Sequence, residues 1–160
     1  MAELLSLRGR TALSPFRITK LLQSLSAAHS AHRITGVTAT FWHFVEISRA
    51  LAENERDKLD RLLTYGPHVD SAAPDGALFL AIPRPGTISP WSSKATDIAR
   101  NCGLDGIVRI ERGVVYRVAT VDGGEISSAE RAALLPLIHD RMTEAVFDDL
   151  AVARRLFAHF

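Results

Sequence analysis

The segment from Pro83 to Ile98, PRPGTISPWSSKATDI, holds the side chains of this sequence that are best suited to bind an anion or a protein partner. Its Ser89-Pro90 pair is typical of a helix start, because the serine hydroxyl can cap the first turn and proline fits the first helical position. The free N–H groups and the dipole of such a start favour negative charge. The side chains gathered around this helix start are Arg84, Thr87, Ser89, Trp91, Ser92, Ser93 and Lys94.

Two interpretations of this segment stay open. Capping explains Ser89, and a solvated first turn explains Ser92 and Ser93, which fits an ordinary helix start. Capping does not require arginine, tryptophan and lysine together, however, and their presence favours an anion site or a partner surface. The segment is therefore the candidate site of this chain.

No other segment combines residues suited to catalysis. The amidotransferase type of nucleophilic cysteine lies on a Gly-x-Cys-x-Gly turn, whereas Cys102 has Arg100 in place of the first glycine, so we interpret Cys102 as a core thiol near a helix end. Among the histidines only His29 and His32 are close in sequence, without a carboxylate or cysteine at metal-ligand spacing. Glycine-rich phosphate loops are missing as well. We predict no catalytic residue and no metal site in this chain.

The composition narrows the class of protein. With 160 residues, 47% of them hydrophobic, the chain is long enough for one domain with a real core. A net charge of +1 without runs of like charge excludes the basic surface typical of nucleic-acid binding. The single cysteine, the lack of a signal peptide and the lack of an apolar stretch of roughly 18 residues predict a soluble, cytoplasmic protein that contacts no membrane.

The chain contains the same unit twice, at an offset of 75 residues (89 − 14 and 126 − 51). Ser14-Pro15-Phe16 corresponds to Ser89-Pro90-Trp91, and residues 51–63, LAENERDKLDRLL, correspond to residues 126–138, ISSAERAALLPLI. Two separate segments that agree on one offset indicate an internal duplication. We predict one domain over residues 1–160, with halves of about 1–70 and 76–150.

Each half is predicted to run strand, helix, strand, helix. In the first half, strands at 3–8 and 35–47 flank a helix whose apolar face carries Ile18, Leu21, Leu22 and Leu25. In the second half, a strand at 77–83 precedes a helix at 90–102 that ends at Gly103. Strand residues follow at 107–121, with a hairpin at Glu111-Arg112-Gly113 as one alternative.

The end of the second half is predicted to be helical. Ser127 and Glu130 form a capping box for a fourth helix, and Pro136 should kink or restart it. Residues 139–144 then lead into a last amphipathic stretch, whose apolar residues are Val146, Leu150, Leu156 and Phe157.

Two such halves predict an α+β fold, in which pseudo-twofold-related halves form one antiparallel or mixed sheet with the helices on one face. The other face would carry Trp42 and Phe44, which are more apolar than a solvated surface requires. We predict that Trp42 and Phe44 pack on another domain or on a second copy. Ordinary burial under the linker at 71–76 is the alternative.

The sequence resembles a known family along its whole length. Residues 84–104, RPGTISPWSSKATDIARNCGL, are similar to the signature of the N-terminal domain of the large, single-chain phosphoribosylformylglycinamidine synthase, or formylglycinamide ribonucleotide amidotransferase. LLTYGP at 62–67, IERG at 110–113 and HDRMTE at 139–144 resemble further stretches of that domain.

This resemblance implies a non-catalytic domain of a multidomain ligase in purine biosynthesis. The whole enzyme converts formylglycinamide ribonucleotide, ATP and glutamine into formylglycinamidine ribonucleotide. The expected partners are the synthetase and glutaminase domains of the same polypeptide, outside these 160 residues, and the fold would be similar to a fused dimer of the small subunit of the multi-subunit enzyme. No cofactor is expected in this chain, whereas the full-length enzyme would use ATP and magnesium.

The resemblance also implies a role for the candidate segment. The domain would dock on its partners and help enclose the substrate site and the ammonia path, and the side chains at that contact would be Arg84, Thr87, Trp91, Ser92, Ser93 and Lys94. Two other functions fit the residues alone. One is a free-standing ferredoxin-like module that binds a small ligand or regulates, and the other is an assembly domain that self-associates through Trp42 and Phe44.

Overall fold

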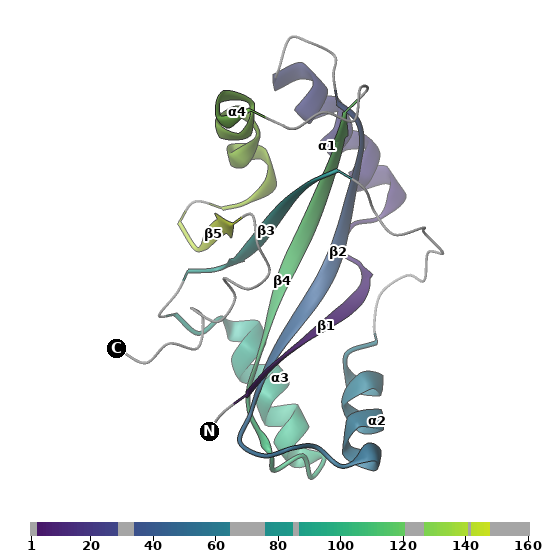
Figure 1. Cartoon of the computed structure of the whole chain (residues 1–160), viewed down its shortest axis with the longest axis vertical. Helices are drawn as coiled ribbons and strands as arrows, with labels where there is room; N and C mark the ends of the chain where they lie inside the picture. The colour runs from purple at the N-terminus through teal and green to yellow at the C-terminus, as the bar shows by residue number, and fades with distance from the viewer. Residues whose placement is uncertain are drawn as a thin grey trace.

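The computed structural model describes residues 3–28, 34–64, 76–84, 87–120, 127–140 and 142–147. Strands and helices alternate from the first described element to the last (Figure 1). Their bounds are β1 (Glu3–Thr11), α1 (Pro15–Ala28), β2 (Ile34–Ile47), α2 (Glu53–Leu62), β3 (Ala77–Pro83), α3 (Pro90–Asn101), β4 (Ile107–Thr120), α4 (Ser128–Ile138) and β5 (Glu144–Phe147).

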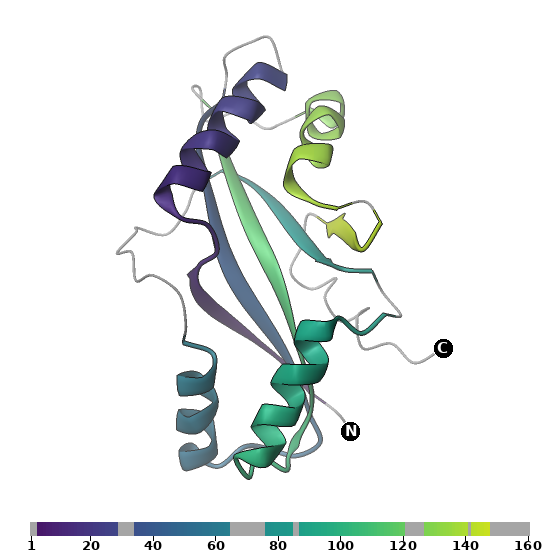
Figure 2. The ribbon, with the colours of Figure 1, turned by 180° about the vertical axis from the view of Figure 1, so that it is seen from behind.

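The strands form one antiparallel sheet in the order β1-β2-β4-β3-β5. The long strands β2 and β4 pair at the centre, and β1 and β3 flank them (Figure 1). Seen from the other side, α1 and α3 cross in front of the strands, with α2 and α4 toward the two margins (Figure 2). This confirms the predicted α+β fold with helices on one face.

The two halves have the same element order and the same helix spacing. The first residues of α1 and α3, Pro15 and Pro90, are 75 residues apart, as are the first residues of α2 and α4, Glu53 and Ser128. In the sheet, each half contributes one outer strand and one central strand, so the order β1-β2-β4-β3 is symmetric about the β2/β4 pair.

The helices pack on one face of this sheet, against apolar side chains from alternate strand positions. One cluster joins Val45 and Ile110 to Leu59 of α2 and Ala99 of α3. A second cluster joins Val37, Phe79 and Val118 to Leu25 of α1 and Leu134 of α4. All four helices therefore pack against the same face.

The opposite face carries its own apolar cluster, built from Phe44, Leu80, Ile82 and Val115. Phe44 is 0% exposed. This corrects the prediction for Phe44, because a side chain without exposed surface contacts no partner in this conformation. Trp42 is partly buried against the same cluster, and its predicted partner stays a prediction.

β4 is one continuous strand, and the alternative of a hairpin at Glu111-Arg112-Gly113 is wrong. These residues pair with Phe44, His43 and Trp42 of β2 without interruption. Gly113 is required for packing rather than for a turn. A Cβ at Gly113 would lie 2.7 Å from Ile82 Cγ2 and 3.1 Å from the Ala81 carbonyl oxygen.

The ends of the second-half helices agree with the capping signals of the sequence. Ser127 and Glu130 form the predicted capping box of α4. Gly103 has a φ of 85° directly after α3, a conformation that favours glycine. Cys102 beside it is exposed, so its interpretation as a core thiol is wrong.

The segment after α4 differs from the predicted amphipathic stretch. Pro136 lies inside α4, which ends two residues later at Ile138, and residues 144–147 form β5 on the outer edge of β3. Leu150, Leu156, Phe157 and most of the 71–76 linker lie outside the described residues. Within the described part of the chain, no helix is both long and apolar enough to cross a membrane.

Replacing Gly113 by alanine tests the close approach of β3 and β4. We expect the free energy of unfolding to fall by about 1–3 kcal/mol, because the added methyl overlaps Ile82 and the β3 backbone. Gly36→Ala is the matched control, since a Cβ there would lie 3.8 Å from the Ala119 Cβ, an ordinary van der Waals contact. Urea unfolding of both variants measures the difference, and equal stability would contradict the packing described.

Candidate functional site

A cleft of about 500 Å³ lies where α3 begins, and we call it the α3 start cleft. Its walls come from the end of β3, the loop residues before α3, the start of α3, the middle of β4, Phe41 of β2 and residues 142–144 at the start of β5. Its lining includes Phe41, Arg84, Thr87, Ile88, Ser89, Trp91, Glu111, Arg112 and Met142.

Side chains of α3 complete the outer edge of β4 beyond the end of β3. The Ser92 hydroxyl donates to the Ile110 carbonyl at 2.5 Å, and the Ile110 N–H donates to Thr96 Oγ1 at 3.0 Å. Arg100 Nη2 donates to the Val108 carbonyl at 3.0 Å. Because residues 92, 96 and 100 recur every four positions, they share one side of the helix and bond successive outward-facing groups of the strand.

The buried carboxylate of Glu111 fixes the loop that leads into α3. Ser89 donates its hydroxyl to Glu111 Oε1 at 2.7 Å, and Arg109 forms an ion pair with Glu111 Oε2 at 2.8 Å. Arg109 also donates to the Thr87 carbonyl at 2.8 Å. A buried carboxylate is tolerated only with such partners, so this network defines one conformation of the loop.

An arginine stacks on two aromatic rings that line the cleft. The Arg112 guanidinium carbon is 4.6 Å from the ring centroids of both Phe41 and Trp91, within the range of cation–π attraction. The His43 ring lies beside Trp91, with their centroids 5.8 Å apart. Burial, and secondly the charge of Arg112, lower the pKa of His43 to about 4, so His43 is neutral at physiological pH.

The outer rim of the cleft combines apolar and cationic side chains. Ile88 is 63% exposed and Met142 is 85% exposed, which is unusual for such large apolar residues. Arg84 and Thr87 are exposed on the same loop. Aromatic residues, methionine and arginine are the types enriched in protein interfaces, so the arrangement is suited to binding a partner.

The structure brings together only part of the predicted site. Arg84, Thr87, Ser89 and Trp91 line the cleft, with Ser89 engaged as the helix cap. Lys94 lies instead on a separate cavity of about 180 Å³ together with Trp91 and Ile98. Ser93 is exposed, and Ser92 is fully buried under the helix with its hydroxyl bonded to β4. In this conformation Ser92 has a structural role.

Several residues that line the cleft were not predicted as site residues from the sequence, among them Phe41, Ile88, Glu111, Arg112 and Met142. Glu111 and Arg112 belong to the predicted strand at 107–121, where a hairpin at residues 111–113 was one alternative. The signal that could have identified them is the strand pattern on both sides, which places Glu111 and Arg112 in the middle of β4. No group of three or more His, Cys, Asp or Glu residues suited to a metal occurs among the described residues.

Fold and cleft together define a class: an α+β domain with one antiparallel sheet, one helix-covered face and a surface cleft suited to binding a partner. The family model of the formylglycinamide ribonucleotide amidotransferase N-terminal domain matches residues 40–157 of this chain, and the chain belongs to that family. It is therefore a domain of a purine-biosynthesis amidotransferase.

The role of Ser92 is tested by Ser92→Ala. We expect a loss of about 1–3 kcal/mol in the free energy of unfolding, because the buried Ile110 carbonyl loses its donor. Ser93→Ala is the matched control, since Ser93 is exposed in the same helical turn, and it should change stability by less than about 0.5 kcal/mol. Denaturant unfolding distinguishes the two variants, and equal values would refute the edge-completing role.

The burial of His43 predicts a pH dependence of stability. The pKa of His43 is about 4 in the folded chain and about 6.5 when the chain is unfolded, so between these values only the unfolded chain binds a proton at His43. The free energy of unfolding is therefore unaffected by protonation of His43 above pH 6.5 and falls as the pH falls toward 4. The full loss approaches about 3 kcal/mol. His43→Asn should lack this component in unfolding experiments from pH 8 to pH 4. An NMR titration in which the His43 ring ionises near pH 6.5 would contradict the burial.

Proposed function

We propose that this chain is the non-catalytic N-terminal domain of the enzyme and that its α3 start cleft docks on the synthetase and glutaminase domains of the same polypeptide. In that position it would help enclose the substrate site and the ammonia path. The observation that supports the proposal is the exposed rim of Ile88, Met142 and Arg84 around the Arg112–Trp91 stack.

A docking domain is suited to this reaction for a physical reason. Ammonia and the activated intermediate of an ATP-dependent amidation both have to be kept from bulk water, and a domain that closes over the site provides that exclusion. A rigid surface serves this purpose better than a mobile one. The Glu111 network supports such rigidity, because it holds the loop through Ser89, Arg109 and Thr87.

The chemistry would lie in the other domains of the enzyme. We propose that ATP and magnesium bind in the synthetase domain and that glutamine is hydrolysed in the glutaminase domain, in the cytoplasm. The repeated element order further supports the proposal of an internal duplication, equivalent to a dimer of the small subunit of the multi-subunit enzyme.

A second candidate function is a small-ligand-binding module of ferredoxin-like type. The volume of the cleft, about 500 Å³, favours it, because small-molecule sites fall in the range of roughly 300–1,000 Å³. Calorimetry of the 160-residue chain with formylglycinamide ribonucleotide separates the two functions. Binding to this chain alone would support the module, and binding only to the intact enzyme would support the docking domain.

Substitutions in the intact enzyme test the docking proposal. Arg112→Ala and Arg84→Ala should lower glutamine-dependent turnover by at least about tenfold, because truncating an arginine at the centre of an interface commonly costs about 2 kcal/mol. Lys94→Ala tests the neighbouring cavity in the same assay. Arg61→Ala is the matched control, since Arg61 is an exposed arginine in the last turn of α2, outside the α3 start cleft, and should leave turnover unchanged. Turnover unchanged in all of the cleft variants would remove the proposal.

A further inference from the structure

The two outer margins of the sheet are treated differently in the two halves. At the margin of the second half, β5 pairs with β3 from Leu80 to Pro83. The carbonyl of Leu78, just before that pairing, accepts a 2.8 Å hydrogen bond from Arg131 of α4, whose guanidinium also lies over the Phe79 ring. Side chain and strand together satisfy this edge, as a stable sheet margin requires.

At the margin of the first half, β1 has an outer edge with no strand paired to it among the described residues. The Ala39 carbonyl accepts a hydrogen bond from the Ala12 N–H, so the backbone N–H and C=O groups of the odd-numbered residues of β2 point toward β1. Leu5 and Leu7 pair with Val45 and His43, so their backbone groups point toward β2. Because the direction alternates along a strand, the backbone groups of Leu4, Ser6 and Arg8 point away from the sheet.

In the first half, α2 takes the place of α4, but its corresponding arginine makes no equivalent bond to the strand in the described contacts. The residue of α2 that corresponds to Arg131 at the 75-residue offset is Arg56. Its Nε lies 3.7 Å from Asp60 on the same helix, and both side chains are largely exposed. The first half thus keeps the arginine but directs it along its own helix.

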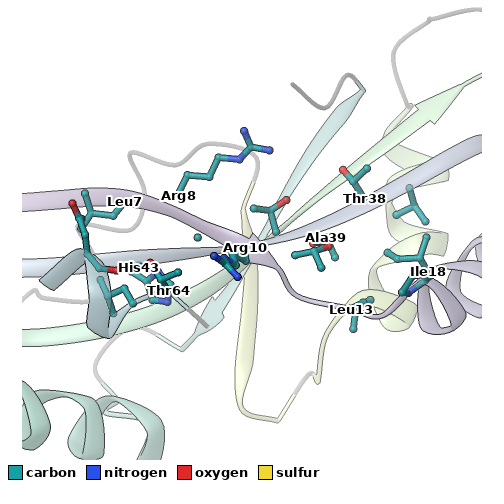
Figure 3. A pocket seen from close by; sticks show the side chains of 16 residues that line it. Leu7, Arg8, Arg10, Leu13, Ile18, Thr38, Ala39, His43 and Thr64 are labelled. Atoms are coloured by element: carbon teal, nitrogen blue, oxygen red, sulfur yellow. Dashed lines mark hydrogen bonds between the residues drawn. The ribbon is translucent and has the colours of Figure 1, made fainter. Parts of the chain in front are cut away.

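A cavity of about 970 Å³ runs along the same margin. It is lined by consecutive residues of β1, from Leu7 to Thr11, and of β2, from Val37 to Thr40. Successive strand residues point to opposite faces, so a cavity lined by all of them follows the edge of the sheet rather than one face. Figure 3 shows this directly, with Arg8 on one side of the strands and Leu13 and Ile18 on the other.

The charged side chains that line this edge groove are basic on balance. Arg8 and Arg10 line it, and α1, which borders it through Pro15 and Ile18, contains Arg17 and Lys20 but no acidic residue. Asp60 is the acidic residue among the lining side chains. Pairing of two copies of β1 would bring these arginines together, which opposes self-association at this edge.

We propose that the outer edge of β1 receives an extended, acidic segment from another domain of the same enzyme, which pairs with β1 as β5 pairs with β3. Main-chain hydrogen bonds to Leu4, Ser6 and Arg8 hold the segment, and Arg8 and Arg10 select its charge. This inference rests on the proposed function, because it names a second contact of the same docking domain.

Amide hydrogen exchange tests the proposal in the 160-residue chain and in the intact enzyme. The amides of Leu4, Ser6 and Arg8 should exchange at least about tenfold more slowly in the intact enzyme, because each gains a strand partner there. Slow exchange of these amides in the 160-residue chain would overturn the proposal, since the chain would then close the edge by itself.

The same measurement separates this proposal from the docking function. If the first turn of α3 and the Thr87 loop become protected in the intact enzyme while β1 does not, strand addition is wrong and docking through the cleft stands. If neither region becomes protected, the docking function fails as well.

Charge reversal tests the acidity of the incoming segment. Arg8→Glu should remove the added protection of β1 in the intact enzyme, whereas the matched control Arg8→Lys should retain it. Arg8 is exposed, so neither change disturbs the core. Ser6→Pro provides a second variant, because it removes an outward N–H without touching the β1/β2 hydrogen bonds. Protection that persists in both Arg8→Glu and Ser6→Pro would overturn the proposal.

Discussion

The structure depends on how the backbone groups along the outer edges of β2 and β4 are satisfied. Both central strands have 14 residues, while β1 has nine and β3 has seven, so strand pairing alone leaves part of each outer edge uncovered. For β4, α3 supplies the missing partners through Ser92, Thr96 and Arg100. Unsatisfied buried backbone groups are costly, and this requirement therefore fixes both the position of α3 along β4 and its rotation about its own axis.

The α3 start cleft follows from that placement. Once Ser92 bonds Ile110, the preceding turn brings the Ser89 cap onto the carboxylate of Glu111, the next residue of the strand. The Arg112 guanidinium then lies over the rings of both Trp91 and Phe41 of β2. The polar network is buried and the apolar rim is exposed, so the cleft is rigid where it meets the sheet and open where a partner would bind.

Much of the fold was predictable because its signals are local and occur twice. The Ser-Pro helix starts, the capping box at Ser127 and the apolar spacing of α1 each depend on a few neighbouring residues. The errors share a different cause, since Gly113 and Phe44 depend on contacts with β3, and Ser92 depends on a contact with β4, all distant in sequence. In the candidate site, the loop side chains were predictable from the helix start, whereas Glu111 and Arg112 required the register of β4 against α3.

The two halves share an architecture but satisfy their central strands by different means. The residues of α1 that correspond to Ser92, Thr96 and Arg100 at the 75-residue offset are Arg17, Leu21 and Leu25. Leucine has no group to bond a strand edge, and Leu21 and Leu25 instead join the apolar cluster beneath α1. Hydrogen bonds hold α3 in one register along β4, whereas apolar packing is less directional. The same architecture thus yields, in one half, a central strand whose edge is bonded by helix side chains. In the other half it yields a larger groove along β1, to which no outer strand is paired among the described residues.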